Sequence, residues 1–255
     1  MDNSLSYFTY KSSLSLELEG KVTNVGLSLV SDDIDDLNYN VNEILHPQEC
    51  MFYDALLYPK RKLNYFIGRY CAKQAISVHT QQNPFEILIE NGAFQQPFIS
   101  ACDTQNVQVS ISHTDTLGGA ISFHEAYPMA IDLESIRKEK EETIHPLLKN
   151  EELILLRSLI CESPLIMLWT IKEALSKAIK CGLTIPLDLL EVESVRKHGN
   201  LFISLYKNFP LYQAASFFLI DTVCTIIYPK AAQLHIDVLA IQKSISVFRR
   251  RYAKK

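Results

Sequence analysis

Two carboxylates that stand two residues apart are the first feature of the sequence with chemical potential. In the segment "AIDLESI", Asp132 and Glu134 alternate with Ile131 and Leu133. Side chains of a strand point alternately to its two faces, so both carboxylates are expected on one face. Neighbouring carboxylates repel each other unless a proton or cation lies between them, and such oxygen ligands suit Mg2+ bound together with substrate phosphates. A solvent-exposed strand end with two acids is the alternative, because motifs this short often arise by chance.

A third carboxylate lies on a predicted helix, "LWTIKEALSKAIKCGL", residues 168–183. On its polar side, Glu173 follows Lys172 and precedes Lys177 by four residues. An exposed pair of this kind contributes only about 0.3 to 0.5 kcal/mol to a helix, so these charges are either an ordinary solvated face or groups held for chemistry. The apolar residues recur at helical spacing and predict a buried stripe of Leu168, Ile171, Leu175, Ala178 and Ile179.

Further groups suited to anions occur in two other segments. "VSISH" ends with Ser112 and His113, whose hydroxyl and imidazole could donate hydrogen bonds to phosphate oxygens. A surface or core histidine is the alternative, and a hydrolase triad is poorly supported because no GxSxG elbow surrounds the serine. In the predicted helix of residues 60–79, the spacing of Lys62, Arg69 and Lys73 places three cations along one helical side. That side is either a phosphate-binding surface or a solvated cationic face.

The elements that must position these groups follow from hydrophobic patterning. Alternation predicts a strand pair turned near Gly20 or Asn24, a hairpin turned at Asn91 and Gly92, and three strands after residue 106. Helical patterns cover residues 60–79 and 141–182, and the chain is then strand-rich to about residue 229. We therefore expect an α+β protein with small, mainly antiparallel sheets packed with helices, divided into subdomains of residues 1–128 and 129–255.

Composition limits the functional class. The chain has 255 residues and a net charge of -4, so it lacks the positive field typical of nucleic-acid binders. No segment approaches the roughly 20 apolar residues that cross a bilayer. The six cysteines are scattered without a CxxC pair, which favours a reduced cytoplasm. We expect a cytoplasmic protein without nucleic-acid or membrane partners, ending in a loose basic tail, "FRRRYAKK".

Four segments, "GRYCAK", "SISH", "AIDLE" and "WTIKEALSKAIKCGL", resemble in their order the motif series of the 4'-phosphopantetheinyl transferase superfamily, in particular its two-domain, surfactin-type branch. The resemblance extends over residues 45–190. It implies two similar subdomains related by a pseudo-two-fold axis, with coenzyme A in the cleft between them. Such enzymes transfer the phosphopantetheine arm of coenzyme A to a serine of an apo acyl or peptidyl carrier protein and release adenosine 3',5'-bisphosphate, usually as monomers.

The motif match also implies roles for individual residues. Glu151 would be the base that accepts the serine proton, with Glu152 adjoining it, and Lys177 would lie near the leaving phosphate. The chain departs from many relatives at Gln96, where they carry a lysine before the proline. That change motivates a second hypothesis, a non-catalytic relative that binds coenzyme A or carrier proteins. The implied ligands of Mg2+, or of Mn2+, are Asp132, Glu134 and Glu173, and the implied coenzyme A contacts are Arg69, Lys73, Ser112, His113, Lys172 and Lys177.

Overall fold

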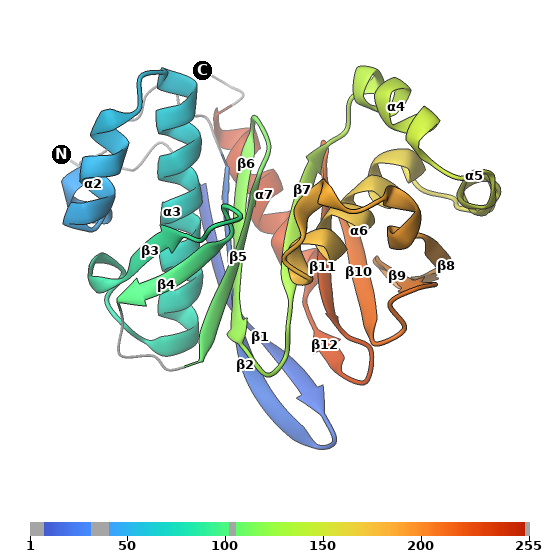
Figure 1. Ribbon diagram of the computed structural model, residues 1–255, viewed down its shortest axis with the longest axis horizontal. Helices are drawn as coiled ribbons and strands as arrows, with labels where there is room; N and C mark the ends of the chain where they lie inside the picture. The colour runs from blue at the N-terminus through green and yellow to red at the C-terminus, as the bar shows by residue number, and fades with distance from the viewer. Residues whose placement is uncertain (1–7, 32–40, 102–105, 253–255) are drawn as a thin grey trace.

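The computed structural model describes residues 8–31, 41–101 and 106–252, and its chain folds into two five-stranded antiparallel sheets with helices packed against them (Figure 1). The predicted α+β class is therefore confirmed. The first sheet has the strand order β12-β1-β2-β6-β5, and the second has the order β7-β11-β10-β9-β8. A separate two-stranded ribbon is formed by β3 and β4.

The first half begins with a long hairpin of β1 (Phe8–Leu18) and β2 (Lys21–Ser31). Its two-residue loop holds Glu19 at φ 51° and Gly20 at φ 77°, and positive φ at both positions matches the right-handed twist of the strands. The predicted turn at Gly20 is thus confirmed. The remaining elements of this half are α1 (Val41–Ile44), α2 (Pro47–Ala55), α3 (Pro59–Thr80), the 3-10 helix η2 (Pro84–Glu86), β3 (Leu88–Asn91), β4 (Pro97–Ala101), β5 (Val107–His113) and β6 (Leu117–His124).

The second half repeats this arrangement. Its elements are β7 (Ala130–Ser135), α4 (Lys138–Ile144), η3 (His145–Leu147), α5 (Asn150–Arg157), α6 (Pro164–Ala178), η4 (Gly182–Thr184), η5 (Leu187–Leu190), β8 (Val192–His198), β9 (Leu201–Tyr206), β10 (Tyr212–Leu219) and β11 (Thr222–Pro229). In each half the strand that precedes the helices, β2 or β7, leads through a long helix, α3 or α6, to a final hairpin, β5–β6 or β10–β11. The last strand of each hairpin pairs with that preceding strand. The two halves therefore share one connectivity.

The end of the chain returns to the first half. Strand β12 (Gln233–His235) pairs with β1, and α7 (Val238–Tyr252) packs against β1 and β10. The division expected at residue 128 falls in the connection between β6 and β7, but this returning segment crosses it. The expected loose tail is wrong for residues 248–252, whose backbone continues α7, while residues 253–255 lie outside the described residues.

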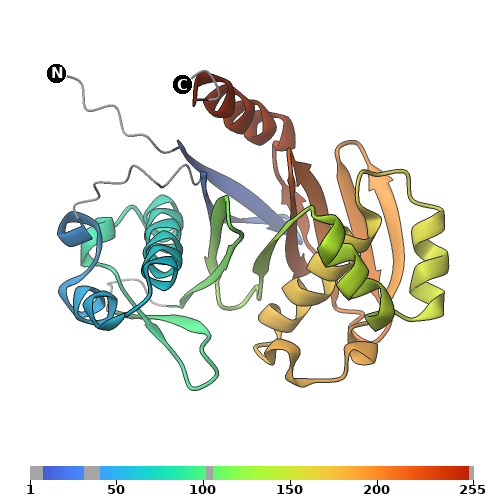
Figure 2. The same ribbon diagram turned by 90° about the horizontal axis from the view of Figure 1, so that it is seen from above.

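Three groups of buried apolar residues hold the layers together. One lies between α3 and the first sheet, and a second lies between α6 and the second sheet. The third joins the two sheets to each other and to α7. Figure 2 shows α6 and α7 on opposite sides of the second sheet. The predicted stripe on α6 is confirmed, since Leu168, Ile171 and Leu175 have no exposed surface.

A buried glutamate and lysine tie the long helix of the first half to its neighbours, and we call this pair the first clamp. Glu49 of α2 accepts hydrogen bonds from the backbone N–H of His46, at 2.9 Å, and of Ile89, at 3.1 Å. Its carboxylate lies 2.8 Å from the ammonium group of Lys73 on α3, and both side chains are at most 1% exposed. Burial lowers the pKa of Lys73, and the carboxylate of Glu49 opposes that shift.

The second half contains the equivalent pair, the second clamp. Glu152 of α5 accepts hydrogen bonds from the backbone N–H of Lys149, at 3.2 Å, and of Val192, at 3.0 Å. Its carboxylate lies 2.7 Å from the ammonium group of Lys172 on α6, again with both side chains at most 1% exposed. In both clamps the glutamate lies in the first turn of a helix and accepts a hydrogen bond from a backbone N–H near the start of a later strand, β3 or β8. Its charge also neutralises a lysine of the long helix. The halves therefore repeat an interaction as well as a topology.

Candidate functional site

The two sheets meet edge to edge at strands β5 and β7. The hydroxyl groups of Ser110 and Ser112 accept hydrogen bonds from the backbone N–H of Ile131, at 3.2 Å, and of Leu133, at 3.1 Å. Serines two residues apart on a strand point the same way, so they engage alternate N–H groups of the neighbouring strand. This contact fixes the position of β7, and with it the side chains that β7 presents.

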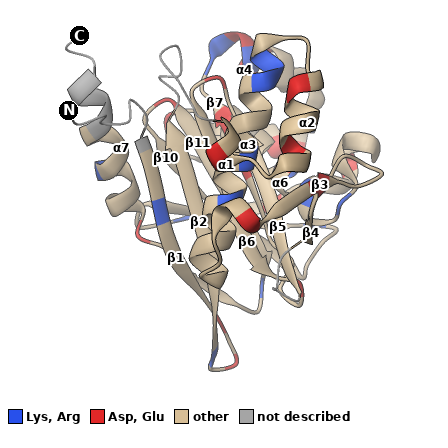
Figure 3. Cartoon of the chain, turned by 90° about the vertical axis from the view of Figure 1, so that its left-hand side faces the viewer, with Lys and Arg blue, Asp and Glu red and all other residues tan. Residues whose placement is uncertain are grey.

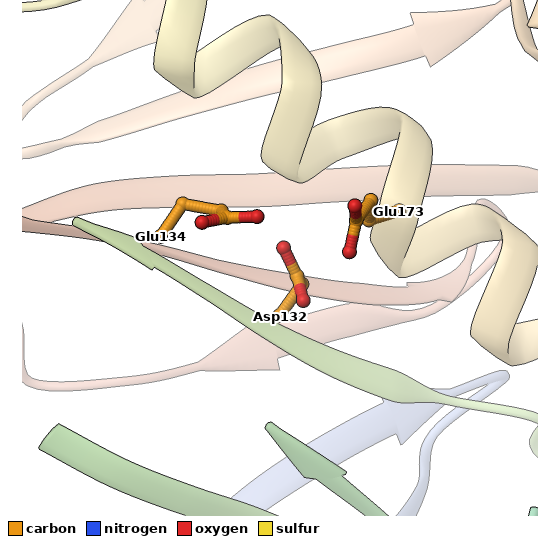
Figure 4. Close-up of side chains that lie close together, drawn as sticks. All are labelled: Asp132, Glu134 and Glu173. Atoms are coloured by element: carbon orange, nitrogen blue, oxygen red, sulfur yellow. The ribbon is translucent and has the colours of Figure 1, made fainter. Parts of the chain in front are cut away.

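Three carboxylates converge beside this seam (Figure 4). Asp132 and Glu134 extend from one face of β7, and Glu173 extends toward them from α6. One oxygen of each lies within 4.8 Å of the others. Asp132 is 1% exposed and Glu134 is 8% exposed. The structure thus brings together the three predicted metal ligands, while their role in binding a metal stays a prediction.

The hydrogen bonding of Asp132 suits a cation. Its Oδ1 lies 2.6 Å from the ammonium group of Lys177 and accepts a hydrogen bond from the hydroxyl of Ser112 at 2.9 Å. Its Oδ2 is buried and has no hydrogen-bond partner. A buried carboxylate oxygen without a partner is costly in free energy, and a hard divalent cation is the partner that such an oxygen prefers. The residues present therefore fit the metal that the sequence motifs imply.

The charges around Glu173 also favour the binding of a cation at this cluster. Burial raises the pKa of Glu173, the negative charge of Asp132 raises it further, and Lys177 and Lys140 oppose the shift. The indole N–H of Trp169, one helical turn earlier, donates a hydrogen bond that also favours the carboxylate. Three carboxylates thus face two ammonium groups, and a further positive charge would stabilise the ionised cluster.

Lys177 extends from α6 across the seam between the halves. Its ammonium group lies near Asp132 and donates to the hydroxyl of Ser112 at 2.9 Å, with longer contacts to the carbonyl oxygens of Ile111, at 3.4 Å, and Ile131, at 3.5 Å. The hydroxyl of Ser112 is thereby fully occupied and the residue is only 5% exposed. The expected contact between Ser112 and a phosphate is not supported, because this hydroxyl orients Asp132 instead.

His113 lies at the exposed end of β5, where ion pairs connect charged side chains of the two halves. Partial burial lowers the pKa of His113, Lys177 lowers it further, and Asp115 opposes the shift. Asp115 lies just after β5. Its two carboxylate oxygens lie 2.9 Å from the ammonium group of Lys60, in the first turn of α3, and 2.9 Å from the guanidinium group of Arg137, which precedes α4. Cations of both halves therefore lie near His113, and we call this end of the seam the cationic mouth; the contact of His113 with a phosphate stays a prediction.

The structure separates the two clamp lysines from this site. Lys73 and Lys172 were expected to contact coenzyme A phosphates, yet each ammonium group is buried against a glutamate. A side chain without exposed surface cannot meet a bound phosphate in this conformation. Lys172 adjoins Glu173 in sequence, but the helix directs the two side chains to different surroundings. Both expectations are corrected: these lysines support the helices that carry the site.

Two further predicted residues lie elsewhere. Arg69 is 6% exposed, and its guanidinium group donates to the Asn91 side chain at 2.8 Å, lies over the ring of Tyr65 and is 3.8 Å from the carboxylate of Glu49. Its contacts are therefore with α2, α3 and β3 and not with the acidic cluster. Glu151 is exposed on α5, which Figure 1 shows at the outer edge of the second half, away from β7. It lines a recess with Lys149 and Glu191. Neither position supports the implied phosphate or base role.

A cavity of about 530 Å³ opens between the halves next to Lys177. Its lining comes from β4, β5, β6, α6, β10 and the connection before β7, and includes Gln96, Pro97, Ser110, Met129, Lys177 and Tyr212. The amide oxygen of Gln96 accepts a hydrogen bond from the backbone N–H of Phe94 at 3.0 Å. The position that many relatives fill with lysine thus carries an uncharged side chain that faces the cavity. A cavity between the halves is thus present among the described residues, and its role as the coenzyme A cleft stays a prediction.

One residue beside the site lies outside the sequence motifs, and a second has a contact that the motifs did not indicate. Lys140 of α4 forms an ion pair with Glu134, and burial lowers the pKa of Lys140. Trp169 belongs to the motif on α6, is only 9% exposed, and also hydrogen-bonds to Glu173. Helical spacing could have indicated Trp169, because residues four apart lie on the same side of a helix. No local signal indicated Lys140, whose contact depends on how α4 folds back over β7.

Comparison with known proteins gives a match over part of the chain. Residues 128–219 match the family model of the 4'-phosphopantetheinyl transferase superfamily. The matched segment runs from the start of β7 to the end of β10 and includes all three carboxylates and Lys177. No curated protein matches the sequence. Among the described residues, no helix is long and apolar enough to span a membrane.

Proposed function

We propose that this chain transfers the 4'-phosphopantetheine arm of coenzyme A to a serine hydroxyl of an apo acyl or peptidyl carrier protein, with release of adenosine 3',5'-bisphosphate. One observation carries the proposal. The three-carboxylate cluster, with its unpartnered buried oxygen on Asp132, lies within the segment that matches the superfamily and beside a cleft between the two halves. The shared connectivity of the halves supports the two-domain, surfactin-type branch.

Asp132, Glu134 and Glu173 would hold Mg2+, or Mn2+, in this site. When bound, such a cation would neutralise the diphosphate of coenzyme A and polarise its phosphorus toward attack. Catalysis of phosphoryl transfer rests mainly on positioning and charge stabilisation, which this chain's own residues can supply.

Individual residues have distinct tasks in this proposal. The ammonium group of Lys177 lies between the cluster and the cavity, where it would stabilise negative charge on the leaving phosphate. His113, at the cationic mouth, would donate a hydrogen bond to a phosphate oxygen. Ser112 positions the carboxylate of Asp132, and the two clamps hold the helices in place. Every group of this proposed site comes from one chain, so the proposal needs no second copy.

A non-catalytic relative that binds coenzyme A or a carrier is the second candidate. The uncharged Gln96 in the cavity wall favours it, since a missing cation weakens the attraction for phosphate. The complete set of three carboxylates favours the enzyme. Titration calorimetry separates the two, because a binder holds coenzyme A without consuming it.

The direct test is modification of apo carrier proteins in the presence of coenzyme A and Mg2+, followed by intact-protein mass spectrometry. We expect the mass of one phosphopantetheine group to be added to at least one carrier. Asp132→Asn and Glu173→Gln should lower the rate by at least about 100-fold, because each removes a charged ligand of the cation that would stabilise negative charge in the transition state. Glu142→Gln, an exposed acid on α4, is the matched control and should retain wild-type activity. Absence of modification across fatty-acid, polyketide and peptide carriers would contradict the proposal.

A further inference from the structure

Two ammonium groups neutralise the acidic cluster, and they are held in different ways. Lys177 contacts two side chains and approaches two carbonyl oxygens of the seam. Lys140 has one ion-pair partner in the described part of the chain, Glu134. The Lys140 side chain is 35% exposed, compared with 29% for Lys177. Lys140 is therefore less constrained than Lys177, and its displacement from the cluster costs less free energy.

The ammonium group of Lys140 contacts one of the carboxylates that a metal would use. It lies against an oxygen of Glu134, one of the three carboxylates that would hold the cation. An ammonium group and a divalent cation compete for such an oxygen, because both need its negative charge and their like charges repel each other. Metal binding at all three carboxylates therefore favours movement of Lys140 away from this oxygen of Glu134.

The fold keeps a displaced Lys140 close to the site. Helix α4 begins at Lys138, shortly after β7 ends at Ser135, so the lysine stays on a short tether beside the cluster. The charges that face it are Glu134, Glu173, Asp132 and, at the mouth, Asp115. Figure 3 shows basic and acidic residues together at the end of the molecule where α2, α3 and α4 lie. An anionic group that enters with the metal would meet the released ammonium group there.

We propose that Lys140 is an internal counter-ion of the metal site, displaced from Glu134 by the divalent cation and then used to bind the diphosphate of coenzyme A. This inference rests on the proposed function for the identity of metal and substrate. It assigns Lys140 two opposite effects. Lys140 weakens metal binding to the free protein, because it competes for Glu134, and it strengthens coenzyme A binding to the metal-loaded protein.

These opposite effects can be measured without turnover. Mn2+ binding to the protein alone is followed by electron paramagnetic resonance of the free ion, and coenzyme A binding at saturating Mn2+ is followed by calorimetry without a carrier. We expect Lys140→Gln to bind Mn2+ about three- to tenfold more tightly and coenzyme A about three- to tenfold more weakly than the wild type. Lys140→Arg keeps the charge and should resemble the wild type in Mn2+ binding. Lys138→Gln, an exposed lysine two residues earlier, should change neither affinity by more than about twofold.

The outcomes distinguish the inference from the proposed function. Unchanged or weaker Mn2+ binding by folded Lys140→Gln, with its circular dichroism spectrum intact, overturns the counter-ion role. Tighter Mn2+ binding with unaltered coenzyme A affinity overturns the diphosphate contact. Asp132→Asn tests the metal site itself: if Mn2+ binding does not depend on Asp132, the proposed function loses its metal centre and the inference falls with it.

Discussion

Breaking the second clamp should destabilise the protein far more than its single ion pair suggests at first sight. Lys172→Met removes the cation that lies 2.7 Å from the carboxylate of Glu152 and leaves that carboxylate without exposed surface. Loss of one partner from a buried pair costs about 3 to 5 kcal/mol, because an uncompensated charge stays in a poorly solvated place. A domain is stable by only about 5 to 15 kcal/mol, so this one substitution removes a large share of the free energy of unfolding.

The glutamate side of the clamp should be the more sensitive. Glu152 also accepts hydrogen bonds from the backbone N–H of Lys149 and Val192, so its removal leaves unpaired donors as well as an unpaired ammonium group. Each buried polar group without a partner adds about 1 to 3 kcal/mol. Glu152→Gln keeps an acceptor oxygen, and the double variant Glu152→Gln with Lys172→Met leaves no charge behind. The double variant should therefore be less destabilised than the sum of the two single variants by about 2 kcal/mol or more.

The assay is urea-induced unfolding at neutral pH, followed by circular dichroism and by the fluorescence of Trp169, the single tryptophan of the chain, which lies on α6. Lys73→Met in the first clamp should cause a loss of similar size, because the two pairs share their burial and their backbone contacts. Lys138→Met, an exposed control, should stay within about 0.5 kcal/mol of the wild type. If Lys172→Met also stays within about 1 kcal/mol of the wild type, or if the single variants are additive, the two charges do not depend on each other and the reasoning fails.

Two further predictions concern stability alone. Lys149 and Lys207 hold the pKa of Glu191 at about 2, below its usual 4.5, so its contribution to stability is present above pH 4.5 and is lost as the pH falls toward 2. Glu191→Gln should flatten that part of the pH dependence of the unfolding free energy, and an unchanged acid limb in urea titrations between pH 5 and 2 would contradict this assignment. A Cβ atom on Gly26 would lie 2.0 Å from the backbone oxygen of Ala75, whereas on Gly68 it would meet nothing closer than 3.4 Å. Gly26→Ala should thus lower the free energy of unfolding by about 1 to 3 kcal/mol or more. Gly68→Ala, within α3, should raise it by up to about 1 kcal/mol. Thermal midpoints that shift in the same direction for both variants would refute the packing argument.

Much of the fold could be predicted from local sequence patterns. Alternation of apolar residues indicated the hairpin of β1 and β2, the ribbon of β3 and β4, and the strands β5 to β7. The expected helix over residues 60–79 corresponds to α3 at Pro59–Thr80. Such predictions succeed because the period of burial along one element is a property of neighbouring residues. The same logic placed Asp132 and Glu134 on one face of a strand, and their convergence with Glu173 is seen in the structure.

What tertiary structure alone decided is which charged side chains point inward. The spacing of Arg69 and Lys73 placed them on one side of a helix, but spacing does not say whether that side meets solvent, a ligand or the core. The answer depends on Glu49, which a separate helix delivers to the buried ammonium group. In the same way, the hydroxyl of Ser112, expected to contact a phosphate, donates to Asp132 because β5 lies beside β7. Lys140 pairs with Glu134 because α4 lies close to the cluster.

The sequence by itself determined the chemistry that is available: three carboxylates, a lysine one turn after the third, and the strand and helix that carry them. The tertiary structure determined which charged groups lie together in one poorly solvated site and which form buried ion pairs that stabilise the fold. The physical reason is that local periodicity is set by backbone geometry, whereas the partner of a buried charge comes from distant elements and is chosen by packing.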